Sequence, residues 1–118
     1  NNIKIQKSKI LIMGFTFKEN CSDIRNTKVF DIYKNLIKNK CLVDVFDPCL
    51  NDDELKKEYK IASVKKIKKY YYDAVIFAVG HNIFKKKNKK QITQLLSSNG
   101  LVIDMKNIYS KSYGFKKI

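Results

Sequence analysis

Residues 9–33 have the sequence KILIMGFTFKENCSDIRNTKVFDIY, and the rest of the chain is arranged around this stretch. Its first part, residues 9–15, contains the apolar run ILIM, which predicts a strand buried on both faces of a sheet. Gly14 ends this strand and permits a tight backbone turn. A polar loop follows over residues 16–26, and a helix is predicted to begin near Thr27.

The polar loop contains Lys18 and Arg25, and Arg25 is the only arginine among 25 basic residues. Arginine offers a rigid, planar fork of donors that suits phosphate or carboxylate, whereas lysine acts as a point charge. Composition alone fits a role in anion binding and a chance occurrence equally well. The loop lacks the GxGxxG pattern, so phosphate binding here would depend on side chains rather than on a glycine cradle.

Downstream of the loop, the pattern continues as helix and strand. Apolar residues at helical spacing predict a helix over residues 27–40 with its stripe facing the core. The alternating run CLVDVF at residues 41–46 predicts a strand, which Asp47 and Pro48 end because proline cannot continue a central ladder. The first 48 residues therefore predict a strand–helix–strand unit with a right-handed parallel crossover.

The second half predicts further alternation of helices and strands. We expect the following elements: a short helix at 51–58, a brief strand or connector at 59–64, a short helix or turn at 65–72, a buried strand at 73–79, a helix at 83–97 stopped by Asn99-Gly100, a buried strand at 101–105, and a tail of loop and irregular coil at 109–118. The sequence thus predicts a three-layer α/β domain, Rossmann-like, with an open parallel sheet of about five strands.

In open parallel sheets, ligands bind beyond the carboxyl ends of the strands. Those ends are predicted to present Lys18 and Arg25, then Asp47, His81 and Lys106. This predicts a basic crevice with a few fixed donors, which suits an anionic, phosphorylated ligand.

The net charge of +14 raises the alternative of a stand-alone basic module that binds nucleic acid. Tyr70–Tyr72 offer rings that stack on bases. Against this, the lysines are scattered, with clusters only at residues 65–69 and 85–90, and no basic stripe interleaved with aromatics runs along one element. We therefore expect solvated lysine faces and no nucleic-acid partner.

The chain has three cysteines, Cys21, Cys41 and Cys49, and one histidine, His81. Their spacing matches no usual zinc set, so we predict no metal site and no catalytic nucleophile. Cys41 is predicted to be a small core residue. No apolar run of about 20 residues spans a membrane and the polar start lacks a signal pattern, so a cytoplasmic protein is expected.

Residues 14–29, GFTFKENCSDIRNTKV, closely resemble the signature of the C-terminal, UDP-binding domain of the UDP-glucose and GDP-mannose dehydrogenase family. Further matches follow in register, with VDVFDP at 43–48, YDAVIFAVGHNIF at 72–84 and LVIDMKNI at 101–108. The resemblance covers residues 9–108, which would form the UDP-sugar-binding domain. Residues 1–8 would then be a linker or the end of an upstream helix, and residues 109–118 a tail.

The resemblance also implies roles for individual residues. Phe17 and Lys18 match positions that contact the UDP-sugar in the family, and Lys106 falls at a basic position that helps to hold the substrate. Arg25 matches the arginine that reaches across the interdomain cleft to the pyrophosphate of NAD. His81 falls in a turn that usually reads alanine-histidine, and a residue capping a helix start is expected there rather than a catalytic group.

The loop form is most similar to the branch that oxidises UDP-N-acetylhexosamines (GlcNAc, ManNAc or GalNAc) for capsule or O-antigen polysaccharides. Such enzymes use two NAD and a catalytic cysteine to convert a primary alcohol to a carboxylate. No glycine fingerprint or nucleophile setting occurs in these 118 residues. We therefore expect an inactive fragment whose partners are the UDP-sugar and the missing N-terminal and central domains, in an enzyme that forms a homo-oligomer.

Overall fold

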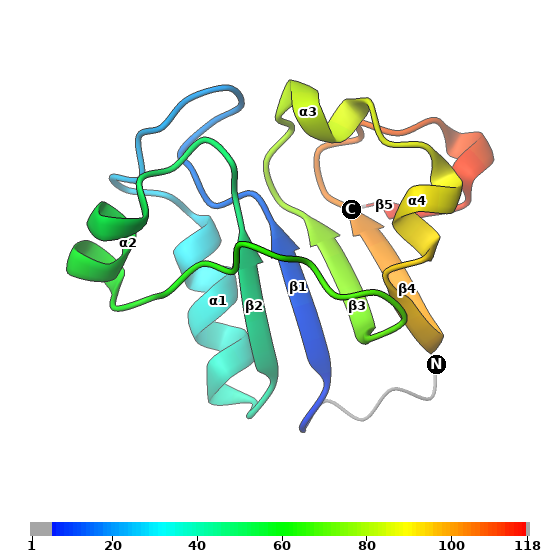
Figure 1. Ribbon diagram of the computed structural model, residues 1–118, viewed down its shortest axis with the longest axis horizontal. Helices are drawn as coiled ribbons and strands as arrows, with labels where there is room; N and C mark the ends of the chain where they lie inside the picture. The colour runs from blue at the N-terminus through cyan, green and yellow to red at the C-terminus, as the bar shows by residue number, and fades with distance from the viewer. Residues whose placement is uncertain (1–5, 118) are drawn as a thin grey trace.

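The computed structural model describes residues 6–117, which form a five-stranded, all-parallel sheet in the order β2-β1-β3-β4-β5. The elements are β1 (Lys9–Met13), α1 (Val29–Lys38), β2 (Leu42–Phe46), α2 (Asp52–Tyr59), β3 (Tyr72–Phe77), α3 (Asn82–Lys85), α4 (Lys89–Thr93), β4 (Leu96–Asp104), the 3-10 helix η1 (Lys111–Tyr113) and β5 (Lys116–Lys117). Figure 1 shows α1 and α2 on the side of β2, α4 beside β4, and α3 beyond the carboxyl end of β3. The predicted open parallel α/β sheet is confirmed.

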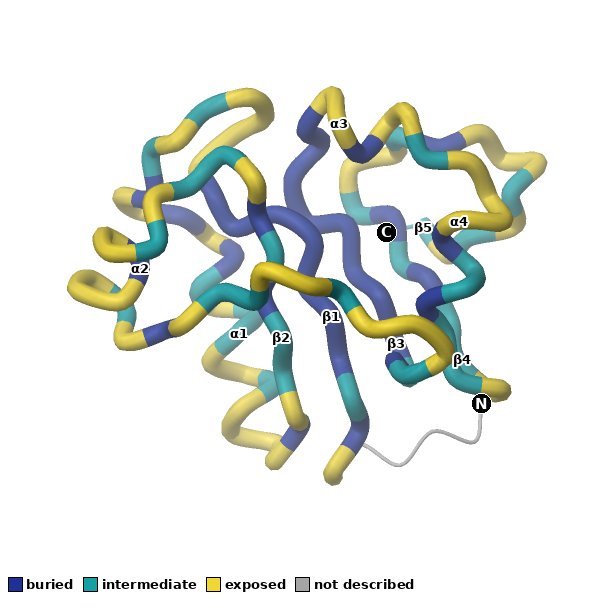
Figure 2. The backbone as a smooth tube through the Cα atoms, viewed as in Figure 1, coloured by how far each residue is buried: buried dark blue, intermediate teal, exposed yellow. Residues whose placement is uncertain are grey.

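Strand β1 lies inside the sheet, between β2 and β3. Its side chains alternate between two cores, as the pleat of a strand requires. Ile10 and Ile12 pack with α1 and α2 on one face, and Leu11 and Met13 pack with α3 and α4 on the other. Figure 2 shows β1 and β3 as the most continuously buried part of the backbone. The apolar run that predicted this strand is therefore covered on both faces.

The predicted helix over 83–97 is wrong in extent. Two short helices, α3 and α4, stand in its place, and β4 already begins at Leu96. Asn88 separates the helices because its side chain accepts a hydrogen bond from the backbone of Gln91, whose side chain in turn accepts one from the backbone of Asn88. This capping box starts a new helix inside the lysine-rich segment.

The predicted stop at Asn99-Gly100 is also wrong, because both residues lie within β4. Gly100 passes close to the neighbouring strand, and a Cβ atom there would lie 2.7 Å from the carbonyl oxygen of Tyr72. The glycine therefore permits close backbone approach at an irregular point of the β3–β4 ladder rather than the end of a helix.

The count of five strands is right, but one member differs. Of the alternatives expected at 59–64 and 65–72, the connector and the turn fit the structure, because residues 60–71 contain neither strand nor helix. The backbone N–H of Val64 nevertheless donates to the carbonyl of Val45. The fifth strand is instead β5, which pairs in parallel with β4. Part of the tail predicted as coil is therefore ordered by the sheet. Of residues 1–8, predicted as linker or upstream helix, residues 1–5 lie outside the described part of the chain.

Candidate functional site

A pocket of about 390 Å³ lies at the carboxyl edge of the sheet, beyond the ends of β1, β3 and β4. It is lined by residues that follow these strands and by the start of α1: Thr16, Phe17, Lys18, Glu19, Thr27, Lys28, Val29, Ile32, Ala78, Val79, Met105 and Lys106. Three residues singled out from the sequence, Phe17, Lys18 and Lys106, thus come together from two distant segments.

The pocket combines an apolar wall with a basic rim. Val29, Val79 and Met105 supply apolar surface, and the residue Phe17 is 56% exposed. Three lysines outnumber the single carboxylate of Glu19 among the lining residues. The sequence analysis missed Lys28, the residue just before α1. Its place at the start of the helix that follows the loop was the available signal. The arrangement suits a ligand with a flat ring and an anionic group.

Arg25 lies outside this pocket. It lines a smaller hollow of about 180 Å³ with Phe17, Asp23 and Asn26. Its guanidinium binds Asp23 in two-point geometry, with Nε at 3.1 Å from Oδ1 and an Nη atom at 3.0 Å from Oδ2. These hydrogen bonds lower the pKa of Asp23 to about 2. The side chain of Arg25 is nevertheless 83% exposed, so the paired guanidinium remains accessible to solvent beside the binding loop.

Asp47 organises the start of the loop from beneath. Its buried carboxylate accepts hydrogen bonds from the backbone N–H groups of Phe15 at 2.6 Å, Thr16 at 3.1 Å and Cys49 at 2.8 Å. Burial raises the pKa of Asp47, but hydrogen bonds from His81 and from these backbone groups outweigh burial and lower the pKa overall. Asp47 is therefore an ionised anchor for the backbone where the loop leaves β1.

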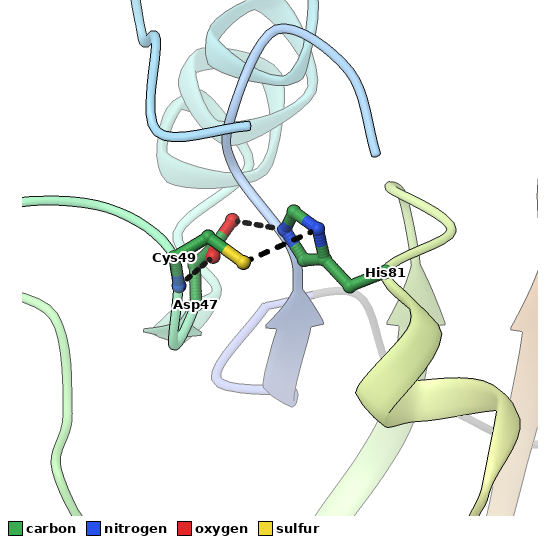
Figure 3. A group of neighbouring side chains, drawn as sticks. All are labelled: Asp47, Cys49 and His81. Carbon is green, nitrogen blue, oxygen red and sulfur yellow. Dashed lines mark hydrogen bonds and ion pairs between the residues drawn. The ribbon is translucent and has the colours of Figure 1, made fainter. Parts of the chain in front are cut away.

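His81 occupies the position before α3, but its side chain does not cap that helix as expected. The imidazole is fully buried and bridges two other segments. Nε2 lies 2.9 Å from Oδ2 of Asp47, and Nδ1 accepts the backbone N–H of Asn20 at 2.9 Å. Because the backbone N–H of Asn20 can only donate, Nδ1 carries the lone pair. Nε2 therefore carries the proton, which it donates to Asp47. Figure 3 shows this bridge from Asp47 to His81.

Cys49 completes a cluster with Asp47 and His81, whose potential ligand atoms all lie within 4.8 Å of one another. The cluster fits a hydrogen-bonded network better than a metal centre. The Asp47 carboxylate already accepts four hydrogen bonds, and Nδ1 of His81 accepts one from Asn20. Burial, Asp47 and Cys21 raise the pKa of Cys49, which disfavours the thiolate that metals and nucleophilic catalysis require.

The segment that carries Lys106 is held by Asp104. This buried carboxylate accepts the backbone N–H groups of Ile108 at 3.1 Å and Tyr109 at 2.9 Å, and the ammonium group of Lys117. The role of Asp104 was missed by the sequence analysis, in which it was only one residue of a buried strand.

The tyrosines considered for base stacking, Tyr70–Tyr72, do not form a stacking surface, because Tyr72 is fully buried and only Tyr70 is largely exposed.

The chain is similar in sequence to curated proteins. The chain is 43% identical over 106 residues to UDP-N-acetyl-D-glucosamine 6-dehydrogenase of Salmonella typhi, which covers 90% of this chain and 25% of that protein. It is 39% identical over 104 residues to the enzyme of the same name from Pseudomonas aeruginosa, with 88% and 25% covered. The chain thus spans about a quarter of the length of these curated relatives.

Solved structures share the fold. The crystal structure of NDP-N-acetyl-D-galactosaminuronic acid dehydrogenase from Methanosarcina mazei Go1 superimposes with a TM-score of 0.82 at 19% identity, over 99% of this chain and 25% of that one. UDP-D-ManNAc dehydrogenase from Pyrococcus horikoshii gives a TM-score of 0.76 at 24% identity, over 99% of this chain and 27% of that one.

Among the described residues, none of the helices has the length and the apolar character that a membrane span requires.

The family model for the UDP binding domain matches residues 11–111, a region that contains the whole pocket and the network beneath it. This chain therefore belongs to the UDP-glucose/GDP-mannose dehydrogenase family, and the matched region is the family's UDP binding domain.

Proposed function

We propose that the pocket bounded by Phe17, Lys18 and Lys106 binds the UDP part of a nucleotide sugar. The observation that carries this proposal is the convergence of these residues, chosen from the sequence, on one pocket with apolar walls and a basic rim. Membership of a family whose domain is described as UDP binding supports the ligand class. The flexible ammonium groups of the lysines neutralise the diphosphate, and the exposed ring of Phe17 packs against a flat or sugar ring.

Arg25 serves a second ligand in this proposal, the pyrophosphate of NAD bound by another part of the same enzyme. Its fork fits that group because it is exposed and already binds a carboxylate of Asp23 in two-point geometry, the geometry that phosphate oxygens also offer. Bound NAD supplies the hydride acceptor. Arg25 contributes only binding and orientation, and Asp23 holds the fork until the cofactor arrives.

The whole enzyme would be an NAD-dependent nucleotide-sugar 6-dehydrogenase in which this chain forms the substrate-side domain. The curated relatives named above are UDP-N-acetyl-D-glucosamine 6-dehydrogenases, which supports a UDP-N-acetylhexosamine as substrate. A uronic acid for capsule or O-antigen polysaccharide is the corresponding product. Both ligands are cytoplasmic metabolites, so the enzyme would act in the cytoplasm, as a homo-oligomer.

Titration of the 118-residue chain with UDP by calorimetry tests the proposal. We expect measurable heat for the wild-type chain and an affinity about tenfold lower for Lys18→Ala, because one charge-assisted hydrogen bond to phosphate is lost. Lys66→Ala is the matched control, since Lys66 is exposed and does not line the pocket. Absence of heat and of NMR shifts at millimolar UDP, or equal losses in both variants, contradicts the proposal.

A further inference from the structure

The binding loop passes over a buried ionisable pair that does not itself line the pocket. Asp47 and His81 are both buried, and neither is among the pocket residues. Their side chains nevertheless contact the backbone of the loop at two points. The pair is therefore placed to control the shape of the loop without touching a ligand.

The two contact points enclose the residues that face the pocket. Asp47 accepts the backbone N–H groups of Phe15 and Thr16 at the start of the loop, and Nδ1 of His81 accepts the N–H of Asn20. Only residues 17–19 lie between these anchors. Because one rigid pair holds both ends of a three-residue span, the path of that span is fixed relative to β2 and β3.

Two further contacts reinforce the same span. The hydroxyl of Thr16 donates to the carbonyl of Lys18 at 3.0 Å. The side-chain oxygen of Asn20 accepts the backbone N–H of Asn82, the residue after His81, at 2.9 Å. Asn20 thus donates a hydrogen bond to His81 and accepts one from Asn82, so the loop is joined to the start of α3 by two hydrogen bonds. Every polar side-chain atom that is buried in the described chain has a hydrogen-bond partner.

We propose that His81, held by Asp47, is the positioning residue of the binding loop: by accepting the N–H of Asn20 at Nδ1, it sets Phe17 and Lys18 in the orientation that binds UDP. This inference rests on the proposed function. The neutral imidazole donates to Asp47 at Nε2 and accepts from Asn20 at Nδ1, so it ties the far end of the span to a carboxylate that already holds the near end. His81 thereby acts on the ligand only through the backbone.

Two substitutions separate the nitrogens of His81. In His81→Asn the side-chain oxygen lies near the position of Nδ1 and still accepts the N–H of Asn20, but the donor to Asp47 is lost. In His81→Gln the amide lies near the position of Nε2 and still donates to Asp47, but the acceptor for Asn20 is lost. Both variants remove the ring, and they differ from each other by one methylene group.

We expect His81→Gln to weaken UDP binding about tenfold, and His81→Asn to stay within about threefold of the wild type, because only the first loses the acceptor for Asn20. Thermal unfolding of both variants checks that the difference in affinity is not a difference in folding. The amide NMR signal of Asn20 should move, and that of Lys18 should show increased mobility, in the Gln variant alone. Equal weakening in both variants, in step with their thermal stability, would overturn the positioning role.

The same data separate this inference from the proposed function. If the wild-type chain binds no UDP, the proposed function fails, but relaxation of the Lys18 amide still decides whether His81 orders the loop. If UDP binds and loop order is the same in the wild-type, Asn and Gln chains, the proposed function stands and the positioning role is wrong.

Discussion

The ammonium group of Lys117 lies 2.5 Å from the buried carboxylate of Asp104, and this ion pair joins β5 to β4. Lys117 also donates to the carbonyl of Tyr109 at 2.6 Å. Asp104 in turn holds the backbone of Ile108 and Tyr109. One pair therefore fixes both the last strand and the turn that carries Lys106 into the pocket.

Replacement of Lys117 by methionine should lower the free energy of unfolding by about 2 kcal/mol, because a hydrogen-bonded charge is removed from a buried carboxylate. Lys116→Met is the matched control, since Lys116 is the exposed neighbour on the same strand and makes no such pair. Urea unfolding measures both variants. Equal losses would show that the pair contributes nothing beyond the removal of one lysine.

Asp104 and Asp47 should make the fold acid-sensitive. Burial raises the pKa of each carboxyl, but hydrogen bonds from Lys117 and backbone groups for Asp104, and from His81 and backbone groups for Asp47, lower it below the ordinary value of 3.8. A depressed pKa in the folded state gives stability that is present above the unfolded pKa and is lost as pH falls through the folded pKa.

The free energy of unfolding should therefore be insensitive to these two groups near neutral pH and should decline once the pH falls below 3.8, continuing toward the depressed values. Urea unfolding at a series of pH values measures this. Asp104→Asn should remove its share of the decline and start from a lower stability at neutral pH. An acid limb identical in the variant and the wild type would exclude Asp104 as a contributor.

Gly14→Ala should destabilise the fold more than Gly114→Ala does. Both glycines have positive φ, +98° and +74°, so alanine strains the backbone at each. At Gly114 nothing lies within 4 Å of an added Cβ, whereas at Gly14 it would lie 2.7 Å from Cβ of Val79. We expect losses of about 1 kcal/mol at Gly114 and about 3 kcal/mol at Gly14, measured by urea unfolding. Similar losses would mean that Val79 moves aside freely.

How far the sequence could predict the fold depended on the kind of signal. Strands β1 and β3 are uninterrupted apolar runs, and their burial on two faces follows directly from that pattern. The helix over 83–97 was wrong because its apolar spacing continues across Asn88, whereas the hydrogen bonds between Asn88 and Gln91 start a second helix there. Strand β5 was missed because two lysines carry no apolar signal, and a contact with Asp104, 13 residues earlier, orders them.

The candidate site divides in the same way. Lys18 and Lys106 were expected at one edge because strand ends in a parallel sheet meet there, and Phe17 was added by the family resemblance; all three line the pocket. The anchoring roles of Asp47 and His81 were not, because they depend on hydrogen bonds between residues 34 positions apart. The polar turns after two buried strands were the available signal, and it indicated proximity but not which atoms meet.

Arg25 and Lys18 should affect different ligands. In the 118-residue chain, Arg25→Ala should leave UDP affinity unchanged, because Arg25 does not line the pocket, while Lys18→Ala weakens it. The exposed pair with Asp23 is screened by solvent, so the urea midpoint should also be unaffected. In the complete dehydrogenase, Arg25→Ala should raise the KM for NAD more than the KM for the nucleotide sugar, as steady-state kinetics measure. The opposite order would reassign Arg25 to the substrate, because its fork would then serve the diphosphate of UDP rather than the pyrophosphate of the cofactor.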